Sequence, residues 1–442
     1  MKTFRDAVHG DMQFDPVEMS VIDTPAMQRL RGIKQLGTSN LVFPSAAHSR
    51  FEHSLGTCWT TKKLFHALEA AGQDFSEEDR RIATLAALLH DVTHVPFGHT
   101  FEDERRLFAR HDEDPERIAH FLDSPPLARA LALSGVGERV RNLLMEKQSK
   151  NANARFLRDI VTGTVCADLL DYLKRDAFHC GLVLGYDERL FQYFQIEEGR
   201  LVVRLHKSGT FRRDALSELV HLLQIRYTLT ERVYYHHAKV VAGAMVSRAL
   251  ELAMASQHFA SEELYSLRDD SLLARLGQLG SPRDGWRDVL EDLESRRLYK
   301  RVYFLTLEGF GRPGLSELER DALAMKYHTD LEQRRSAERW LAEQLGVPEA
   351  HVILYCPSPR MSLKEADVPV EVSPGVVQPL ASLEHPDVKA LTEKHRGLWR
   401  LYVCLRRDHG PLFARAGELC EQLLGHPNQL ESLQRGGLAF GK

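Results

Sequence analysis

The sequence predicts a mainly α-helical protein with a small β-hairpin in its main domain and a smaller α+β domain at its C-terminal end. Apolar residues recur three and four positions apart between about residues 23 and 252, which is the periodicity of amphipathic helices. Two short strand-like runs interrupt that pattern, and more such runs follow about residue 295. These observations predict one domain over residues 1–295 and a second over residues 296–442.

Helical spacing is clearest in five segments of the first domain, which are Thr57–Ala71, Arg80–Leu89, Pro115–Leu122, Arg155–Asp176 and Arg213–Ala253. The stretch Asn40–Ala47 separates helical runs because it contains Pro44, and proline ends helices. Two strand-like runs, Phe194–Ile196 and Leu201–Arg204, flank the turn residues Glu197–Gly199 and predict the hairpin.

Strand-like and helical runs alternate in the C-terminal region. It follows the turn sequence Leu279-Gly280-Ser281-Pro282 and contains one long helical run, Leu318–Leu345. The predicted strands are Tyr299–Leu305, Val352–Tyr355 and Leu398–Leu405, and the predicted loops are Pro357–Pro359 and Val372–Pro379.

Composition limits the class of protein. The 442 residues include 58 Lys and Arg against 62 Asp and Glu, and this net charge of -4 disfavours a nucleic-acid-coating protein. Six scattered cysteines without a CxxC pair are typical of a reducing compartment. Since MKTFRDAVHG lacks an apolar signal region and no apolar run reaches about 20 residues, we expect a cytoplasmic protein without membrane association.

The dipeptide His90-Asp91 is the strongest chemical signal. It ends the apolar run Ile82–Leu89, with His53 upstream and Asp168 downstream. Imidazoles and carboxylates brought together from separate helices form divalent-metal sites, although a single His-Asp pair at a helix end is also common as a cap. His94, one helical turn after His90, and His99 place further titratable groups in the same stretch.

Five stretches share an order and spacing typical of one enzyme family. They are DAVHG (Asp6–Gly10), IDTPAMQRLRGIKQLG (Ile22–Gly37), FPSAAHSRFEHSLG (Phe43–Gly56), HDVTHVPFGHTFE (His90–Glu102) and DLLDYLKRD (Asp168–Asp176). Over about the first 240 residues the chain resembles the HD-domain dNTP triphosphohydrolases, whose vertebrate member carries an added sterile alpha motif domain. The resemblance implies an HD-domain helical core.

The resemblance assigns the metal to His53, His90, Asp91 and Asp168, the same set that the residues themselves suggest. It implies attack of water at the α-phosphorus of a dNTP, with release of deoxynucleoside and triphosphate. The implied catalytic residues are His94, the proton-transfer pair His111-Asp112, and His99 and Glu102 of the same segment. A carboxylate that orients a histidine suits proton transfer, although His111 is equally consistent with a solvated residue in the charged run Arg110–Glu116.

The resemblance also implies substrate contacts and an activator pocket. Candidate phosphate contacts are Arg50, Arg226, Lys174, Arg175 and His237, and candidate sugar contacts are Gln35, Leu36, Tyr172 and Asp176. Any of these arginines is alternatively a surface ion pair, and Tyr172 a core aromatic. Lys2, Asp23, Gln28 and Arg31 resemble positions that bind a guanine-nucleotide activator between subunits, which implies a homo-oligomer; Asp23 or Thr24 is alternatively a simple helix cap.

Several positions depart from the family pattern. Thr93 stands where the family usually has a glycine, and Asp112 stands where it usually has a glutamate. Val95, the residue after the second histidine, also departs from the pattern. Leu169 stands where a lysine commonly follows the distant metal aspartate, which removes a positive charge from the expected phosphate site. His237, Lys239 or Lys174 is a candidate replacement.

Two other functions stay open at this point. One is an HD phosphohydrolase acting on another phosphoester, such as a nucleoside monophosphate, a modified nucleotide or a cyclic dinucleotide. The other is a non-catalytic nucleotide sensor or nucleic-acid-binding scaffold that uses the basic segments Arg204–Arg213 and Arg296–Arg301. The ligand set suits Mn, Fe, Mg, Ni or Zn to different degrees.

Overall fold

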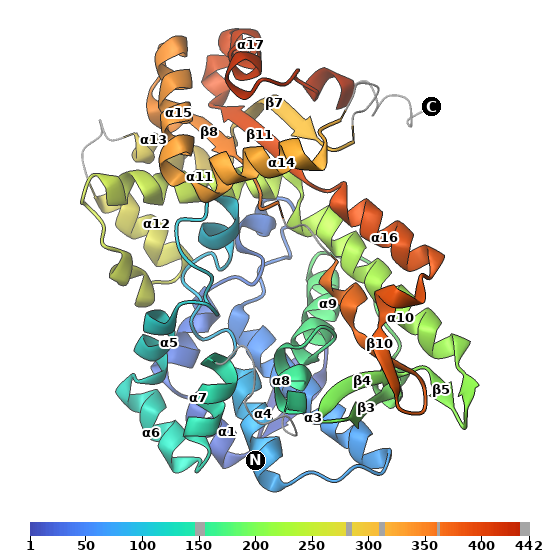
Figure 1. Cartoon of the computed structure of the whole chain (residues 1–442). Coiled ribbons are helices and arrows are strands. Elements are labelled where there is room, and N and C mark those ends of the chain that lie inside the picture. The colour runs from blue at the N-terminus through green and yellow to red at the C-terminus, as the bar shows by residue number, and fades with distance from the viewer. Residues whose placement is uncertain (146–154, 280–284, 309–313, 360–362, 434–442) are drawn as a thin grey trace.

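Helices make up most of the lower part of Figure 1, with a small sheet at its lower right, and a three-stranded sheet with its covering helices lies above them. The structure, a computed structural model, describes residues 1–145, 155–279, 285–308, 314–359 and 363–433. Helices predominate and the sheets are small, which confirms the predicted fold class.

The helices before residue 295 enclose two apolar cores: those up to residue 229 share the largest core, and those from residue 237 onward pack in a second core. They are α1 (Pro16–Ile22), α2 (Pro25–Arg29), α3 (Arg50–Ala70), α4 (Glu77–Leu89), α5 (Pro115–Leu122), α6 (Pro125–Leu133), α7 (Gly137–Met145), α8 (Arg155–Thr162), α9 (Ala167–His179), α10 (Arg213–Leu229), α11 (His237–Ala255), α12 (Asp269–Gln278) and α13 (Trp286–Glu294). At the start of α3, Ser49 and Glu52 form a capping box, which satisfies amide groups that the helix itself leaves free.

Two predicted helices before residue 295 are each divided, and the predicted run Leu318–Leu345 is divided as well, at the π-helical turn Met325–Thr329. The run Arg155–Asp176 was expected to be continuous, but it breaks between α8 and α9 around Gly163, and the break places Asp168 in the first turn of α9. The run Arg213–Ala253 breaks at the π-helical turn Thr230–Tyr234. Apolar spacing continues across both breaks, so periodicity alone does not reveal them.

An N-terminal hairpin that the sequence analysis did not predict packs against the helices. Its antiparallel strands are β1 (Lys2–Asp6) and β2 (Gly10–Phe14), with Met12 and Phe14 buried in the core. The opposite face is exposed, so only two apolar side chains mark the second strand.

A four-stranded sheet joins the predicted hairpin to the C-terminal region. The predicted strands correspond to β3 (Phe194–Glu197) and β4 (Arg200–Arg204), and β4 pairs in parallel with β9 (Pro369–Ser373), which pairs with β10 (Val376–Pro379). The prediction of a loop at Val372–Pro379 was therefore wrong, because the turn at Gly375 closes a second hairpin. Figure 1 shows β10 beside β4, far from the other C-terminal strands.

The C-terminal sheet has the antiparallel order β7-β11-β8, formed by β7 (Lys300–Thr306), β8 (Val352–Tyr355) and β11 (Arg400–Leu405). These are the three predicted strands. The helices of this region are α14 (Glu317–Ala324), α15 (Leu331–Leu345), α16 (Pro386–Arg396) and α17 (Phe413–Leu424). The short strands β5 (His206–Lys207) and β6 (Thr210–Phe211) form a separate ribbon. Beyond Leu279, the predicted turn before this region lies outside the described residues.

The segment from Leu363 to α16 packs with the first core, since Leu363, Val370 and Leu391 belong to it. The predicted boundary at residue 296 stays a prediction, because this later segment returns to the helical core.

All six cysteines lie in the described residues and are buried free thiols. In the part of the chain that the structure describes, no helix is both long and apolar enough to cross a membrane.

Candidate functional site

The predicted metal ligands converge from three helices. His53 lies near the start of α3, His90 caps the C-terminal end of α4 with Asp91 next to it, and Asp168 lies in the first turn of α9. The Nε2 atoms of His53 and His90 are 3.2 Å apart. Asp168 Oδ1 lies 2.9 Å from His53 Nε2 and 3.6 Å from His90 Nε2, and Asp91 Oδ1 lies 3.6 Å from His90 Nε2.

This donor set fits a divalent cation. Ligands about 2.1 Å from a metal lie roughly 3 to 3.5 Å from one another. The ligand atoms of His53, His90 and Asp91 all lie within 4.8 Å of one another, and Asp168 Oδ1 adjoins both imidazoles. His90 Nδ1 contacts the carbonyl oxygen of Ala87 at 2.8 Å, and His53 Nδ1 contacts Asp171 at 2.7 Å. Both contacts favour a proton on Nδ1 and leave Nε2 free to bind a metal.

The electrostatic field at this point also suits a cation. Burial lowers the pKa of His53, but Asp168 and Asp171 more than offset it and raise the pKa to about 10. Burial raises the pKa of Asp91, but Arg50, His90 and His94 hold it well below its ordinary value. Negative charge therefore concentrates around the two imidazoles.

A buried network lies behind His53. Asp171 accepts from His53, from His9 Nε2 at 2.6 Å and from Arg175 Nε at 2.9 Å, and Arg175 also binds Asp6 at 2.8 Å. The Asp171 and Arg175 side chains are fully buried. A Cβ at Gly56 would lie 2.0 Å from Asp171 Oδ1, so only glycine leaves room for this network.

Arg50 lies against Asp91. Its Nη1 is 2.6 Å from Asp91 Oδ2, and the side chain is buried. The loop after α4 approaches it closely: a Cβ at Gly98 would lie 2.4 Å from Arg50 Nη2. Phe97 (φ 61°) and Gly98 (φ 58°) adopt left-handed conformations here, and Asp269 secures the loop by accepting the Phe97 amide at 2.7 Å.

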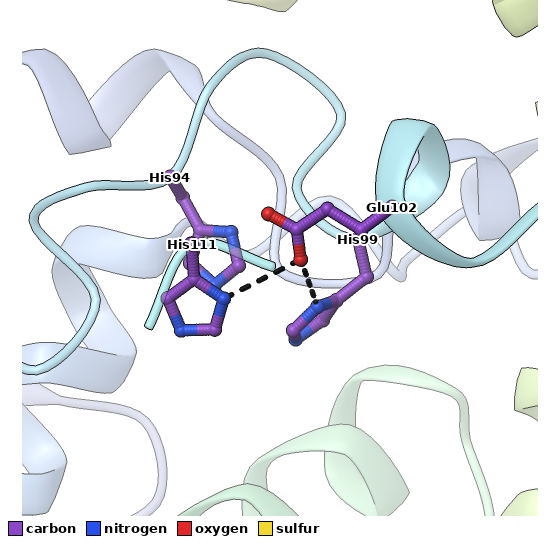
Figure 2. A group of neighbouring side chains, drawn as sticks. All are labelled: His94, His99, Glu102 and His111. Atoms are coloured by element: carbon purple, nitrogen blue, oxygen red, sulfur yellow. Dashed lines mark hydrogen bonds and ion pairs between the residues drawn. The ribbon is translucent and has the colours of Figure 1, made fainter. Parts of the chain in front are cut away.

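Three histidines gather around Glu102 beside the metal ligands (Figure 2). Glu102 Oε2 contacts His99 Nδ1 at 2.9 Å and His111 Nδ1 at 3.4 Å. The His94 ring stacks on His111 with centroids 3.6 Å apart, and His94 Nε2 lies 3.2 Å from Asp91 Oδ1. Arg117 binds the other Glu102 oxygen at 3.2 Å.

The charges of this cluster are uneven. Burial raises the pKa of Glu102, but its bonds to His111 and His99 hold it well below its ordinary value, so the carboxylate is ionised. Burial, Arg50 and His111 hold the pKa of His94 well below its ordinary value, so His94 is neutral. The His99 side chain is 38% exposed while those of His94 and His111 are buried, which makes His99 the histidine that a substrate can approach.

Asp112, the predicted partner of His111, lies at the edge of the cluster. Its Oδ1 is 4.0 Å from His111 Nδ1, beyond hydrogen-bond range, and 3.3 Å from Arg110 Nε. The Asp112 side chain is more than half exposed. In this structure Glu102, rather than Asp112, is the carboxylate within hydrogen-bond distance of His111.

The predicted sugar-contacting residues form a second connected group. Asp176 binds His48 Nε2 at 2.9 Å and the Tyr234 hydroxyl at 2.6 Å. The backbone N–H of Gln35 donates to the His48 carbonyl oxygen at 2.9 Å, and Leu36 is buried next to it. The Tyr172 ring meets the His53 ring edge-on, with centroids 6.3 Å apart.

The predicted phosphate contacts are dispersed. Arg226 binds Glu365 at 3.0 Å over the ring of Tyr172, whereas Lys174 binds Glu188 at 3.3 Å. Arg175 is fully buried against Asp171, so its assignment as a phosphate contact is corrected.

His237 lies elsewhere. It lines a cavity of about 280 Å³ with Arg296, Lys300, Arg301 and Arg407. Lys239 is paired with Glu104. The structure therefore does not bring His237 or Lys174 into contact with the metal ligands.

The predicted activator residues lie in two pairs near the N-terminus. Lys2 Nζ is 3.7 Å from Asp23 Oδ2, and Arg31 Nε donates to Gln28 at 2.8 Å. The Lys2 and Asp23 side chains are more than half exposed. Thr24, the alternative cap, does cap α2 by accepting the Met27 amide.

Sequence reasoning missed Asp171, His9, His48, Tyr234 and Glu365. Asp171 follows Asp168 by one helical turn, and His9 belongs to the DAVHG stretch, so both had a signal in the sequence. Glu365 comes from a distant segment, and nothing in the local pattern connects it with Arg226.

Comparisons with known proteins agree with this geometry. The HD domain model matches residues 50–176, and the HD associated region model matches residues 187–420. An uncharacterized protein of Methanocaldococcus jannaschii is 30% identical over 310 residues, covering 68% of this chain and 59% of that protein. The deoxynucleoside triphosphate triphosphohydrolase SAMHD1 of Mus musculus is 28% identical over 352 residues, covering 68% and 54%. The chain thus spans little more than half the length of these relatives.

Solved structures share the fold. A phosphohydrolase of Bacteroides thetaiotaomicron has a TM-score of 0.67 at 21% identity, covering 92% of this chain and 100% of that one. A hypothetical protein of Aquifex aeolicus has a TM-score of 0.70 at 23% identity, covering 94% and 99%. Since the associated-region model covers more than half of this chain and the HD model covers all four candidate metal ligands, the protein belongs to the HD-domain family and carries the HD-associated region.

Proposed function

We propose that the protein is a metal-dependent phosphohydrolase that cleaves deoxynucleoside triphosphates into deoxynucleoside and inorganic triphosphate. The observation that carries the proposal is the convergence of His53, His90, Asp91 and Asp168, with both Nε2 atoms turned to one point. A divalent cation held there supplies Lewis acidity toward a phosphoryl group and the attacking water. The similarity to deoxynucleoside triphosphate triphosphohydrolases of the SAMHD1 type supports the choice of substrate.

The residues around that point have distinct tasks in this proposal. Glu102 orients His99 and His111 through their Nδ1 atoms, so a proton held on the Nε2 atom of the exposed His99 is available to the leaving oxygen. Arg50 fixes Asp91, and Asp171 fixes His53. Asp176, held by His48 and Tyr234, is placed to bind a sugar hydroxyl.

A second candidate is hydrolysis of another phosphoester by the same centre. The observation that favours it is the lack of unpaired positive charge at two positions expected to face phosphate. Residue 169 is an uncharged leucine, and Arg226 is already paired with Glu365. A substrate with fewer phosphates needs fewer cations. Inorganic phosphate or a linear nucleotide as the product distinguishes this reaction from triphosphate release.

Product analysis tests the proposal. Purified protein is incubated with each dNTP and with Mn or Mg, and the products are separated by ion-exchange chromatography. We expect deoxynucleoside and triphosphate in equal amounts. His90→Ala and Asp91→Ala should lower turnover by about 1,000-fold or more, because each removes a ligand, whereas the exposed His258→Ala should not. Wild-type protein that yields neither product, or His90→Ala that keeps full activity, would refute the proposal.

A further inference from the structure

A cavity of about 300 Å³ opens beside Asp168, one of the four candidate metal ligands, between α9 and the short helical turn Lys364–Asp367. Its wall includes Asp168, Leu169 and Tyr172 from α9, and Lys364 and Glu365 from the C-terminal region. The chain thus brings two charged residues nearly 200 positions away in sequence to the edge of the site.

Lys364 is the only cation among the described residues that line this cavity. The acids on the wall have partners: Asp168 contacts His53, Asp159 contacts Arg200, and Glu365 contacts Arg226. Lys364 forms no ion pair with any residue that the structure describes, and its side chain is exposed. Its positive charge is therefore available to a ligand in the cavity.

The backbone of this segment is firmly placed. Leu363 and Ala366, which flank the two charged residues, are 3% and 4% exposed and belong to the helical core. Val368 continues the same packing, and β9 then pairs with β4. The residues that flank Lys364 therefore pack in the same core as α9, which contains Asp168, so Lys364 does not lie on a free loop.

The other lysines that were candidates for this task are occupied. Lys174 Nζ lies 3.3 Å from Glu188 and 4.3 Å from the centre of the Tyr186 ring. Lys239 is paired with the buried Glu104. Position 169, the first after the metal ligand Asp168, is a buried leucine.

We propose that Lys364 binds a phosphate group of the nucleotide substrate and is a substrate-binding residue contributed by the C-terminal region. The inference rests on the proposed function, since it names a contact of that substrate. An ammonium group on the cavity wall offsets the charge of a phosphate chain that extends from the metal ligands past Leu169.

The test uses the full chain with Lys364→Ala, Lys364→Arg and Lys364→Glu, and with Lys389→Ala on α16 as the matched control. Lys389 is exposed and paired with Glu384, away from the cavity wall. We expect Lys364→Ala to raise KM for dNTPs about tenfold with kcat within about twofold, Lys364→Glu to raise KM further, and Lys364→Arg to stay close to wild type. Lys389→Ala should match wild type.

A binding measurement separates this inference from the reaction itself. Calorimetric titration with inorganic tripolyphosphate in the presence of Mg should show about tenfold weaker binding to Lys364→Ala, and a weaker dependence on salt. If wild type hydrolyses no dNTP but shows this difference, the reaction is refuted and the phosphate contact stands. If wild type hydrolyses dNTPs and all three variants keep its KM and its tripolyphosphate affinity, the role of Lys364 is refuted alone.

Discussion

At the scale of single residues, Glu102 is the shared acid of the histidine cluster. One carboxylate contacts His99 and His111 through one oxygen and Arg117 through the other. Its pKa is held well below the ordinary value although burial opposes this, so it keeps its charge throughout the neutral range. A single side chain therefore sets the orientation of both imidazoles.

Glu102→Gln should lower kcat about 100-fold or more, because the amide leaves both imidazoles without a charged partner that fixes their orientation. Asp112→Asn is the matched control: its exposed carboxylate lies 4.0 Å from His111, so we expect kcat to change by about twofold at most. Steady-state kinetics gives kcat for both variants, and circular dichroism checks that both are folded. A larger loss in Asp112→Asn would restore Asp112 as the partner of His111.

The limits of sequence reasoning at this scale are clear from two residues. His90-Asp91 can be recognised in the sequence because an adjacent imidazole and carboxylate end an apolar run. The partner of His111 cannot be recognised in the same way. Asp112 is adjacent to His111 in sequence, whereas Glu102 lies nine positions earlier, and only the loop conformation places Glu102 closer to His111.

At the scale of elements, the N-terminal hairpin supports the candidate metal site. His9, beside its turn, reaches Asp171 at 2.6 Å, and Asp6 at the end of β1 binds Arg175. Two short strands with one buried face give a weak sequence signal, whereas the support that they give to this site depends on contacts with residues 162 and 169 positions later.

His9→Ala should weaken metal binding about tenfold, because Asp171 loses one of the donors that fix its position against His53. Arg5→Ala on the same hairpin removes only an exposed pair with Asp11 and should leave metal affinity unchanged. Calorimetric titration of metal-free protein with Mn gives the affinities, and the melting temperatures of the metal-free variants monitor the fold. Equal metal affinity in His9→Ala and wild type would show that the hairpin has a purely structural role.

Breaks in helices matter as much as the helices themselves. The break before α9 leaves Asp168 in a first helical turn, where a carboxylate is favoured by the helix dipole. The π-helical turn Thr230–Tyr234 ends with Tyr234, whose hydroxyl reaches Asp176. Periodicity predicts that these segments are helical, but it does not locate the interruptions that position the side chains.

At the scale of the whole molecule, a buried ionic cluster joins the segment after Glu102 to the helices α11 and α15. Arg105, which follows the Glu102 loop, binds Glu338 on α15 at 2.6 Å and Glu251 on α11 at 2.5 Å. Arg248 binds the same two acids at 3.2 and 2.7 Å. The four side chains are essentially fully buried.

Glu338→Gln should lower the free energy of unfolding by about 3 kcal/mol at pH 7, because it leaves buried arginine charge without its partner. Burial raises the pKa of Glu338, but Arg105 and Arg248 outweigh it, so the pKa lies below its ordinary value of 4.5. The stabilisation by the ionised group is therefore present above pH 4.5 and is lost as the pH falls through the lowered pKa.

Urea denaturation at pH 7 and at pH 4 measures this effect. The difference in midpoint between wild type and Glu338→Gln should narrow toward acid, while Glu332→Gln, which removes an exposed pair on the same helix, should stay near wild type at both values. A difference that does not change with pH would exclude the ionised Glu338 as its source.

The sequence by itself determined the helical class and the three strands of the C-terminal sheet, and it predicted the four candidate metal ligands that lie close together in the structure. Each depends on local spacing or on adjacent residues, which the chain carries wherever it folds. Only the tertiary structure decided that β9 returns to β4, that Glu102 serves two histidines, and that Lys364 lies on the cavity wall with Asp168. Such contacts join residues far apart in sequence, and they are set by packing of the whole core rather than by any local preference.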